Sequence, residues 1–248
     1  MSVRFKRSYR DRKQAVARRK KTVLKVFLII VSFQIVFTLF FSTIRIDTIS
    51  MEPSLIKGSV LIYSPFLYGF KINTLKIRLP QVNAPERGDL IVLTPPFIRR
   101  KTGFVPFLSS IMKFLSFGKI NIEALGSDQW DHKYLVKRII AVPGDTIKIS
   151  DYTALIKPQD TDYFLNEFEV IETAYDIDLG KLPEGWDNSL PFSGKMDPLT
   201  LEEDQFFVLG DNRMESSDST YWGILDRKLI EGKVLLTYWP FNRFKVLK

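Results

Sequence analysis

Two side chains in this sequence have the types and surroundings that nucleophilic catalysis requires. Ser50 lies in "DTISMEPSLIKGS" and Lys137 lies in the apolar run "YLVKRIIAV", while the polar stretch "GDNRMESSDSTYWG" adds several hydroxyls. A serine hydroxyl is a weak nucleophile until a base removes its proton, and a lysine whose pKa is lowered by burial can act as that base. These residues indicate a serine nucleophile with a lysine base, although the string around Ser50, taken alone, is more typical of a turn.

The sequence contains one other candidate base, His132, which is its only histidine, and it contains no cysteine. The lack of cysteine excludes a thiol nucleophile and thiolate metal ligands, and a single histidine excludes a histidine-rich metal site. His132 lies in "SDQWDHKY", a polar stretch that is typical of a solvated turn, so Lys137 is the preferred base. We therefore expect neither a metal nor an organic cofactor.

The strand expected around Lys137 determines the environment of its amine. Side chains alternate between the two faces of a strand, which places Lys137 on one face with three apolar residues: Leu135, Ile139 and Ala141. Burial on that face would lower the pKa of the lysine. The alternative is an edge strand from which the lysine extends to water.

The last polar stretch, residues 210–223, is dense in short polar side chains. Ser216, Ser217 and Ser219 flank Asp218, so several hydroxyls lie near one carboxylate. Such side chains commonly bond to nearby backbone in turns. Here one of the hydroxyls could instead hold the lysine amine in position.

The elements that must position these residues begin with a basic tail and an apolar segment. The chain has 248 residues and a net charge of +8, but residues 1–25 hold eleven Lys/Arg against one acid, Asp11. The remainder is slightly acidic, which argues against a nucleic-acid partner. Residues 26–44 carry no charge and are long enough to span a bilayer as a helix.

The basic flank of this segment predicts its orientation. Lys and Arg on its N-terminal side place the tail, residues 1–25, in the cytoplasm and the rest of the chain outside it, with the lipid bilayer as a partner. A cleaved signal peptide is the alternative, but the apolar core is long and its exit, "FFSTIRIDT", lacks a small-x-small site. The predicted location is a cell membrane, crossed once.

After residue 44 the sequence predicts a mainly β fold. Short β-rich runs are separated by turns such as "RGD", "PGD" and "EGK". We expect an antiparallel β-sheet catalytic core formed by residues 45–150 and 206–248. Residues 151–205 hold fourteen acids against three lysines and are predicted to form a smaller inserted subdomain exposed to solvent. Residues 102–129 are either core packing under a loop or a flap on the bilayer interface.

Taken together, the motifs resemble bacterial type I signal peptidases, also called leader peptidases. Four boxes occur in the order typical of that family: "SMEP" from Ser50, "RGD" from Arg87, "YLVKRIIAVPGD" from Tyr134, and "GDNRMESSDSTYWG" from Gly210. The likeness extends from residue 26 to about residue 240. Each box is a weak signal alone, and the four in order behind an apolar anchor are a strong one.

The resemblance implies a Ser/Lys dyad hydrolase without a cofactor. By position, Ser50 would be the nucleophile, Lys137 its general base, and Ser216 the residue that aligns the lysine. The backbone N–H of Ser50 and the hydroxyl of Thr48 would stabilise the oxyanion. Asp218 and Arg138 would be structural neighbours of the site.

The resemblance also implies the substrate. Signal peptidases of this type cut exported preproteins after a small-x-small motif such as Ala-x-Ala, in shallow apolar pockets. The positions here that match pocket-lining ones are Ile46, Met51, Leu55, Leu135 and Val136. Preprotein signal peptides are therefore the expected partners.

The sequence departs from the family pattern at Thr220, where an arginine usually follows the aspartate of the last box. Asp218 then lacks its usual partner, and Arg138 and Arg213 are the candidate replacements. An inactive membrane-anchored protein that binds signal peptides, or an envelope scaffold, is the alternative function. Self-cleaving repressors use the same dyad, but they require an N-terminal DNA-binding domain where this chain has the apolar segment.

Overall fold

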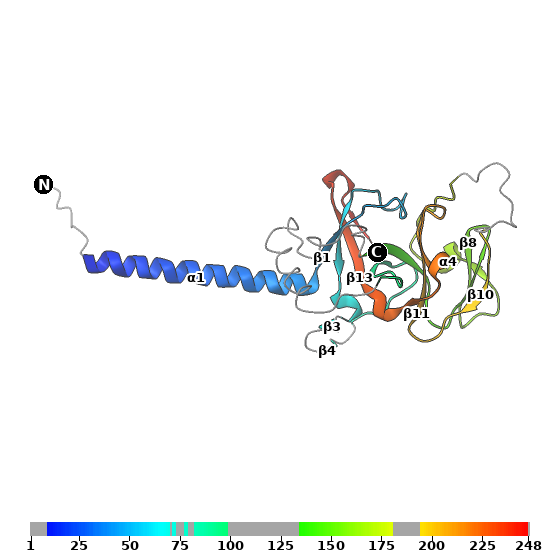
Figure 1. The fold of residues 1–248 in the computed structure, drawn as a ribbon, viewed down its shortest axis with the longest axis horizontal. Helices are drawn as coiled ribbons and strands as arrows, with labels where there is room; N and C mark the ends of the chain where they lie inside the picture. The colour runs from blue at the N-terminus through cyan, green and yellow to red at the C-terminus, as the bar shows by residue number, and fades with distance from the viewer. Residues whose placement is uncertain are drawn as a thin grey trace. The chain divides into compact units, whose positions relative to one another are not determined.

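The structure, a computed structural model, describes residues 9–69, 71–72, 77–78, 82–98, 134–180 and 194–247. It divides into two compact units, Met1–Phe40 and Phe41–Lys248 (Figure 1). Residues 102–129, predicted to be either core packing under a loop or a flap, and the alternative base His132 lie outside the described residues.

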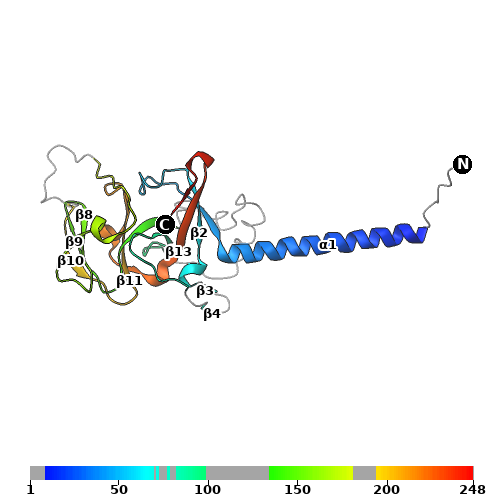
Figure 2. The same ribbon diagram turned by 180° about the vertical axis from the view of Figure 1, so that it is seen from behind.

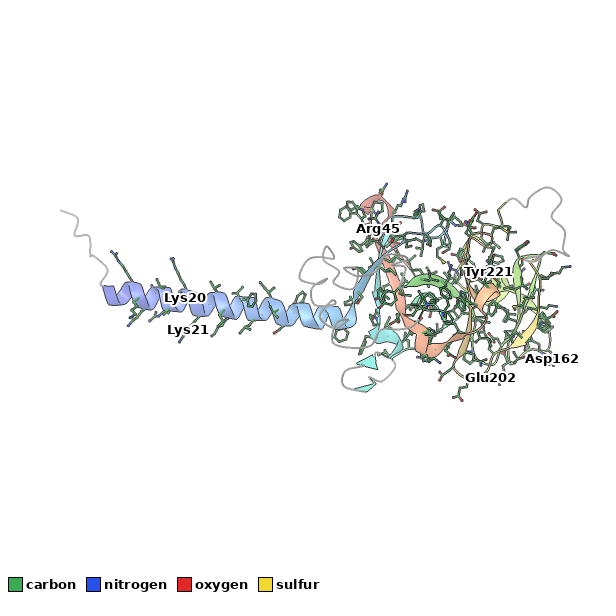
Figure 3. The ribbon with its side chains drawn as sticks, in the orientation of Figure 1. Lys20, Lys21, Arg45, Asp162, Glu202 and Tyr221 are labelled. Atoms are coloured by element: carbon green, nitrogen blue, oxygen red, sulfur yellow. The ribbon has the colours of Figure 1, made fainter. Side chains whose placement is uncertain are left out.

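The first unit consists of the helix α1 (Tyr9–Phe40), from which the side chains of Lys20 and Lys21 project (Figure 3). Within the described part of the chain, no helix is both long enough and apolar enough to cross a membrane. The membrane span predicted at residues 26–44 is therefore not confirmed and stays a prediction from sequence.

The helix α1 ends at Phe40, a few residues before the end of the predicted span, and residues 42–44 lie in the strand β1 (Ser42–Arg45). β1 pairs antiparallel with β2 (Val60–Ser64), so that Thr43 lies opposite Ile62. The β-branched Thr43 and Ile44 favour a strand, and pairing with β2 satisfies their backbone groups.

The second unit is mainly β, as predicted, and is built around one large antiparallel sheet. Its order is β1-β2-β13-β5-β6-β11-β12, with β14 also paired to β13. The remaining strands of this sheet are β5 (Leu90–Leu93), β6 (Leu135–Ala141), β11 (Gln205–Leu209), β12 (Leu225–Asp226), β13 (Ile230–Trp239) and β14 (Lys245–Val246). The central strands β5, β6 and β11 are rich in branched aliphatic residues and are almost wholly buried, as expected for strands covered on both faces.

A second, four-stranded sheet has the order β10-β7-β8-β9. Its strands are β7 (Thr146–Ser150), β8 (Thr153–Lys157), β9 (Leu165–Asn166) and β10 (Met196–Thr200). Figures 1 and 2 show β8 and β10 on the β11 side of the large sheet, away from β1. The boundary predicted after Ser150 separates the paired strands β7 and β8, so the small sheet begins at Thr146 instead.

Short elements connect these sheets. They are α3 (Glu167–Val170), α4 (Ser219–Trp222), the 3-10 helices η1 (Phe66–Tyr68), η3 (Arg227–Leu229) and η4 (Phe241–Arg243), and the two-residue strands β3 (Lys71–Ile72) and β4 (Ile77–Arg78), which pair with each other.

One hydrophobic cluster joins the two sheets. Ile147 and Ile156 of the small sheet pack in it with Phe207 of β11 and with Ile140 and Ala141 of β6. The segment predicted as a solvated subdomain therefore contributes buried core. Each such aliphatic side chain stabilises the fold by about 1.5–3 kcal/mol.

The predicted alternation along β6 fails at its end. Ile140 and its neighbour Ala141 pack in the same cluster, whereas Ile139 packs in a different one. The pairing with β11 shifts register here, since Phe207 lies opposite Ala141 and Val208 lies opposite Ile139. An irregularity of this kind changes the face of the sheet to which the following side chains point.

An ion pair ties the turn before β5 to the turn before β7. Arg87 donates two hydrogen bonds to Asp145, from Nε to Oδ2 at 2.8 Å and from Nη2 to Oδ1 at 2.5 Å. Asp145 is buried and also accepts the backbone N–H of Val142 at 3.0 Å. The carboxylate thus holds together segments that are far apart in the chain.

Removal of this carboxylate should therefore destabilise the fold. We expect Asp145→Ala to lower the free energy of unfolding by about 2–4 kcal/mol, because it leaves a partly buried guanidinium without its partner. Urea denaturation measures this difference. Asp162→Ala is the matched control, since Asp162 is fully exposed (Figure 3) and lies 4.0 Å from Lys157. Equal urea midpoints for the two variants would contradict a stabilising role for the Arg87–Asp145 ion pair.

Candidate active site

Ser50 lies in a turn that follows β1 and is held on both sides by backbone hydrogen bonds. The N–H of Ile46 donates to the carbonyl of Ser59 at 2.9 Å, and the N–H of Leu55 donates to that of Met51 at 2.8 Å. Ser50 is 6% exposed, and its Oγ lies 3.2 Å from Oγ1 of Thr48, in hydrogen-bond contact. The two predicted residues of this turn are therefore together.

Lys137 lies in the middle of β6, opposite Ile91 of β5, and is only 1% exposed. Its side chain does not extend to water. Burial lowers the pKa of Lys137 to about 8, although the carboxylates of Asp218 and Asp211 act in the opposite direction. The amine donates a hydrogen bond to Oγ of Ser216 at 2.8 Å.

Ser216 also forms a hydrogen bond with a carboxylate. Its hydroxyl donates to Oδ2 of Asp218 at 2.5 Å, and the same oxygen accepts the N–H of Gly210 at 3.0 Å. The other oxygen of Asp218 accepts the N–H of Thr220 at 3.1 Å and so caps the short helix α4. Ser216 and Asp218 are both buried. A chain of hydrogen bonds therefore runs from Lys137 through Ser216 to Asp218.

Gly210 brings the Ser50 turn against this chain. A Cβ added at Gly210 would lie 2.2 Å from Oγ of Ser216 and 2.5 Å from the carbonyl oxygen of Ser50, so only glycine fits there. The N–H of Asn212 also donates to the Ser50 carbonyl at 3.2 Å. Ser50 and Lys137 are both described, and they share no hydrogen bond in this structure. They belong to one contiguous cluster through Gly210 and Ser216.

Arg138 does not pair with Asp218, which corrects one predicted replacement. It forms a bidentate ion pair with Asp211, at 2.9 Å from Nε and 2.7 Å from Nη2, and donates to the carbonyl of Gly88 at 3.0 Å. Its guanidinium also lies 4.0 Å from the centre of the Tyr175 ring. The pair is almost wholly buried and holds β6 against the last box.

Arg213, the other predicted replacement, also binds a different carboxylate. It donates to both oxygens of Glu167, at 2.8 and 2.5 Å, and to the carbonyl of Gly210 at 3.1 Å. The hydroxyl of Tyr175 donates to Glu167 as well. Sequence reasoning missed Glu167, Tyr175 and Asp211. A buried arginine requires a carboxylate, but nothing near Glu167 in the sequence marks it as that partner.

Four of the five predicted pocket residues pack together. Ile46, Met51, Leu55 and Val136 are buried in one cluster. Leu135 packs in a different cluster, because it faces the opposite side of β6 from Val136. The structure therefore does not place Leu135 with the other four.

Across the described ranges, no group of three or more His, Asp or Glu side chains is arranged to hold a metal ion.

Comparison with known proteins identifies the family. Residues 19–239 match the model of the family described as signal peptidase, peptidase S26. The chain belongs to this family. The predicted resemblance to type I signal peptidases is confirmed.

Three relatives carry signal peptidase names. "Probable signal peptidase I-2" of Synechocystis sp. is 25% identical over 202 residues, which are 82% of this chain and 65% of that protein. Signal peptidase I of Buchnera aphidicola is 26% identical, covering 96% of this chain and 81% of that protein. Signal peptidase IB of Staphylococcus aureus is 34% identical, covering 44% of this chain and 56% of that protein. The chain thus spans 65%, 81% and 56% of the length of these three relatives.

The buried amine should leave a pH signature in stability. The pKa of Lys137 is about 8 in the folded chain and near 10.5 when unfolded, so the folded state binds fewer protons between these values. This one group should therefore raise the free energy of unfolding of the wild type as the pH rises from about 8 to 10.5. We expect the stability advantage of Lys137→Met over wild type to shrink by roughly 3 kcal/mol across this range.

Urea denaturation of the two proteins at several pH values measures this difference, and groups common to both cancel. Lys57→Met, at an exposed lysine, is the control and should differ from wild type by the same amount at every pH. A constant difference for Lys137→Met as well would mean that the amine is not held away from water.

Proposed function

We propose that this chain is a serine endopeptidase that removes N-terminal signal peptides from exported preproteins after a small-x-small motif. The observation that carries the proposal is the buried amine of Lys137, bonded to Ser216 beside the Ser50 turn. Membership of the signal peptidase family supports the class of reaction. The low pKa of the lysine supports its role as a base near neutral pH.

In the proposed reaction, Oγ of Ser50 attacks the carbonyl carbon of the scissile peptide bond while its proton moves to Nζ of Lys137. The tetrahedral intermediate then collapses, the C–N bond breaks, and Lys137 returns the proton to the leaving amine. Water deprotonated by the same amine hydrolyses the acyl-enzyme. A direct contact between Ser50 and Lys137 must form when substrate binds, since hydrogen bonds of catalytic groups often tighten only then.

The oxyanion would be stabilised next to the nucleophile. The backbone N–H of Ser50 and the hydroxyl of Thr48 are the proposed donors, and the 3.2 Å between Oγ1 of Thr48 and Oγ of Ser50 supports this placement. A donor of this kind typically contributes about 10²–10³ in rate.

The proposed substrate pocket is formed by Ile46, Met51, Leu55 and Val136. These side chains are between 0% and 7% exposed and pack in one cluster, so they present only a small apolar surface. A small side chain such as alanine fits against such a surface, whereas a larger one would clash. This supports a preference for small residues before the cleaved bond.

We also propose that residues 26–44 anchor the chain in a cell membrane with the basic tail in the cytoplasm. The support comes from the sequence alone: nineteen uncharged residues follow a strongly basic flank. An anchor would place Ser50, a few residues later, where the cleavage site of a membrane-inserted signal peptide emerges.

The first test is cleavage of a preprotein with an Ala-x-Ala site by detergent-solubilised protein. We expect Ser50→Ala and Lys137→Met each to lower kcat/KM at least about 10³-fold, because each removes one half of the proposed dyad. The product ends are identified by mass spectrometry. Ser59→Ala, at a buried serine outside the cluster, and Lys57→Met are the matched controls and should cut normally.

The other outcomes of this test are informative. Efficient cleavage by Lys137→Met would assign the base elsewhere, with His132 as the remaining candidate. If the wild type also fails to cut while every variant folds, the chain is a signal-peptide-binding or scaffold protein instead.

The pH dependence of kcat/KM gives a second test. The base must be neutral to accept the proton of Ser50, so activity should rise with pH. We expect the acid limb to have an apparent pKa of about 8, with kcat/KM falling about tenfold per pH unit below it. An inflection near 10 or higher would show that the base is an ordinary solvated lysine.

A further inference from the structure

Asp218 is a buried carboxylate whose hydrogen bonds all come from neutral groups. It is 1% exposed. Oδ1 accepts the hydroxyl of Thr220 at 2.7 Å and its N–H at 3.1 Å, while Oδ2 accepts the hydroxyl of Ser216 at 2.5 Å and the N–H of Gly210 at 3.0 Å. Buried carboxylates are seldom found without a cation beside them. Thr220 provides half of these contacts.

The two arginines that the sequence offered as partners of Asp218 each bind another carboxylate. Arg138 binds both oxygens of Asp211, and Arg213 binds both oxygens of Glu167. Among the described residues, no ion pair reaches Asp218. The positive charge linked to it is therefore that of Lys137, through the hydroxyl of Ser216.

The direction of these hydrogen bonds decides what the amine can do. The single proton of the Ser216 hydroxyl points to Asp218, so Ser216 can only accept from Lys137. A neutral amine has one lone pair. If Ser216 donated its proton to that lone pair, Lys137 could not take a proton from Ser50. The bond from Ser216 to Asp218 therefore leaves the lone pair free.

We propose that Thr220 is a positioning residue of the peptidase. It uses a hydroxyl and a backbone N–H, rather than a cation, to hold Asp218 as an anionic acceptor. Asp218 thereby sets the direction of the hydrogen bonds from Lys137 through Ser216 and keeps its full charge near the amine. This role rests on the proposed function. Thr220 acts through Asp218 and Ser216 and does not itself meet the substrate.

The charges around Lys137 determine which way a change at Thr220 acts. Two carboxylates face the amine, Asp218 and Asp211, and the second is neutralised by Arg138. Across the sheet on β5, the residue opposite Lys137 is the apolar Ile91. Asp218 is thus the uncompensated charge in this surrounding. A cation introduced beside it would make the protonated amine less favourable and would lower the pKa of Lys137.

The hydroxyl is tested with Thr220→Val and Thr220→Ser in the full chain. We expect Thr220→Val to lower kcat about tenfold with KM changed less than twofold, because substrate contacts are untouched while the base is oriented less well. Thr220→Ser keeps the donor and should stay within about threefold of wild type. The matched control is Thr94→Val, at a buried threonine that also gives its hydroxyl to a carboxylate, Glu231, at 2.6 Å. That variant should retain kcat.

The charge is tested with Thr220→Arg by two readouts. The apparent pKa of kcat/KM should fall by about half a unit to one unit. The second readout is an NMR titration of isotopically labelled lysine, in which the Lys137 signal is the one that is missing in Lys137→Met. The pKa of this signal should fall by the same amount, and the measurement does not require the protein to cut a substrate.

The outcomes separate this inference from the proposed function. Full kcat in Thr220→Val, or an unmoved Lys137 titration in Thr220→Arg, would overturn the role of Thr220. If the wild type cuts no preprotein, the proposed function fails, and the NMR titration alone then decides whether Asp218 controls the proton affinity of Lys137.

Discussion

A primary amine buried in a β-sheet is the constraint on which the rest of this site depends. Lys137 is 1% exposed, and burial lowers its pKa to about 8. Within the described part of the chain, its one side-chain hydrogen bond goes to the hydroxyl of Ser216. An amine in this state exchanges its proton near neutral pH only while the neighbouring carboxylates do not restore its charge. Arg138 neutralises Asp211 in this way, whereas Asp218 keeps its charge and is linked to the amine through the hydroxyl of Ser216.

The acidic insertion takes part in this charge balance. Arg138 neutralises Asp211, and the ring of Tyr175 lies against its guanidinium. Tyr175 in turn donates to Glu167, which binds Arg213. Both Tyr175 and Glu167 come from the segment between the last two boxes. Buried arginines are tolerated only with such partners, so α3 and the residues that follow it complete the charge balance of the candidate site.

Sequence reasoning worked where a property is local. Short β-branched runs between turns predicted the strands, and the polar types and order of Ser50, Lys137 and Ser216 marked the residues that the fold brings together. It failed where partners come from distant segments. The carboxylate for Arg213 lies in α3, the register shift beside Ile140 depends on β11, and the separation of Leu135 from the pocket depends on which sheet face each cluster covers. No local pattern encodes these pairings.

The hydroxyl of Thr48 links the observed geometry to the proposed chemistry. It now shares a hydrogen bond with Oγ of Ser50, in which either hydroxyl can be the donor, while Ser50 shares none with Lys137. In the proposed mechanism a substrate carbonyl offers Thr48 a better acceptor, an oxygen that becomes negative. Ser50 is then released to turn toward the amine, whose lone pair Ser216 leaves open. One exchange of partners would thus form the oxyanion site and the dyad together, so that the nucleophile is activated only when a peptide is in place.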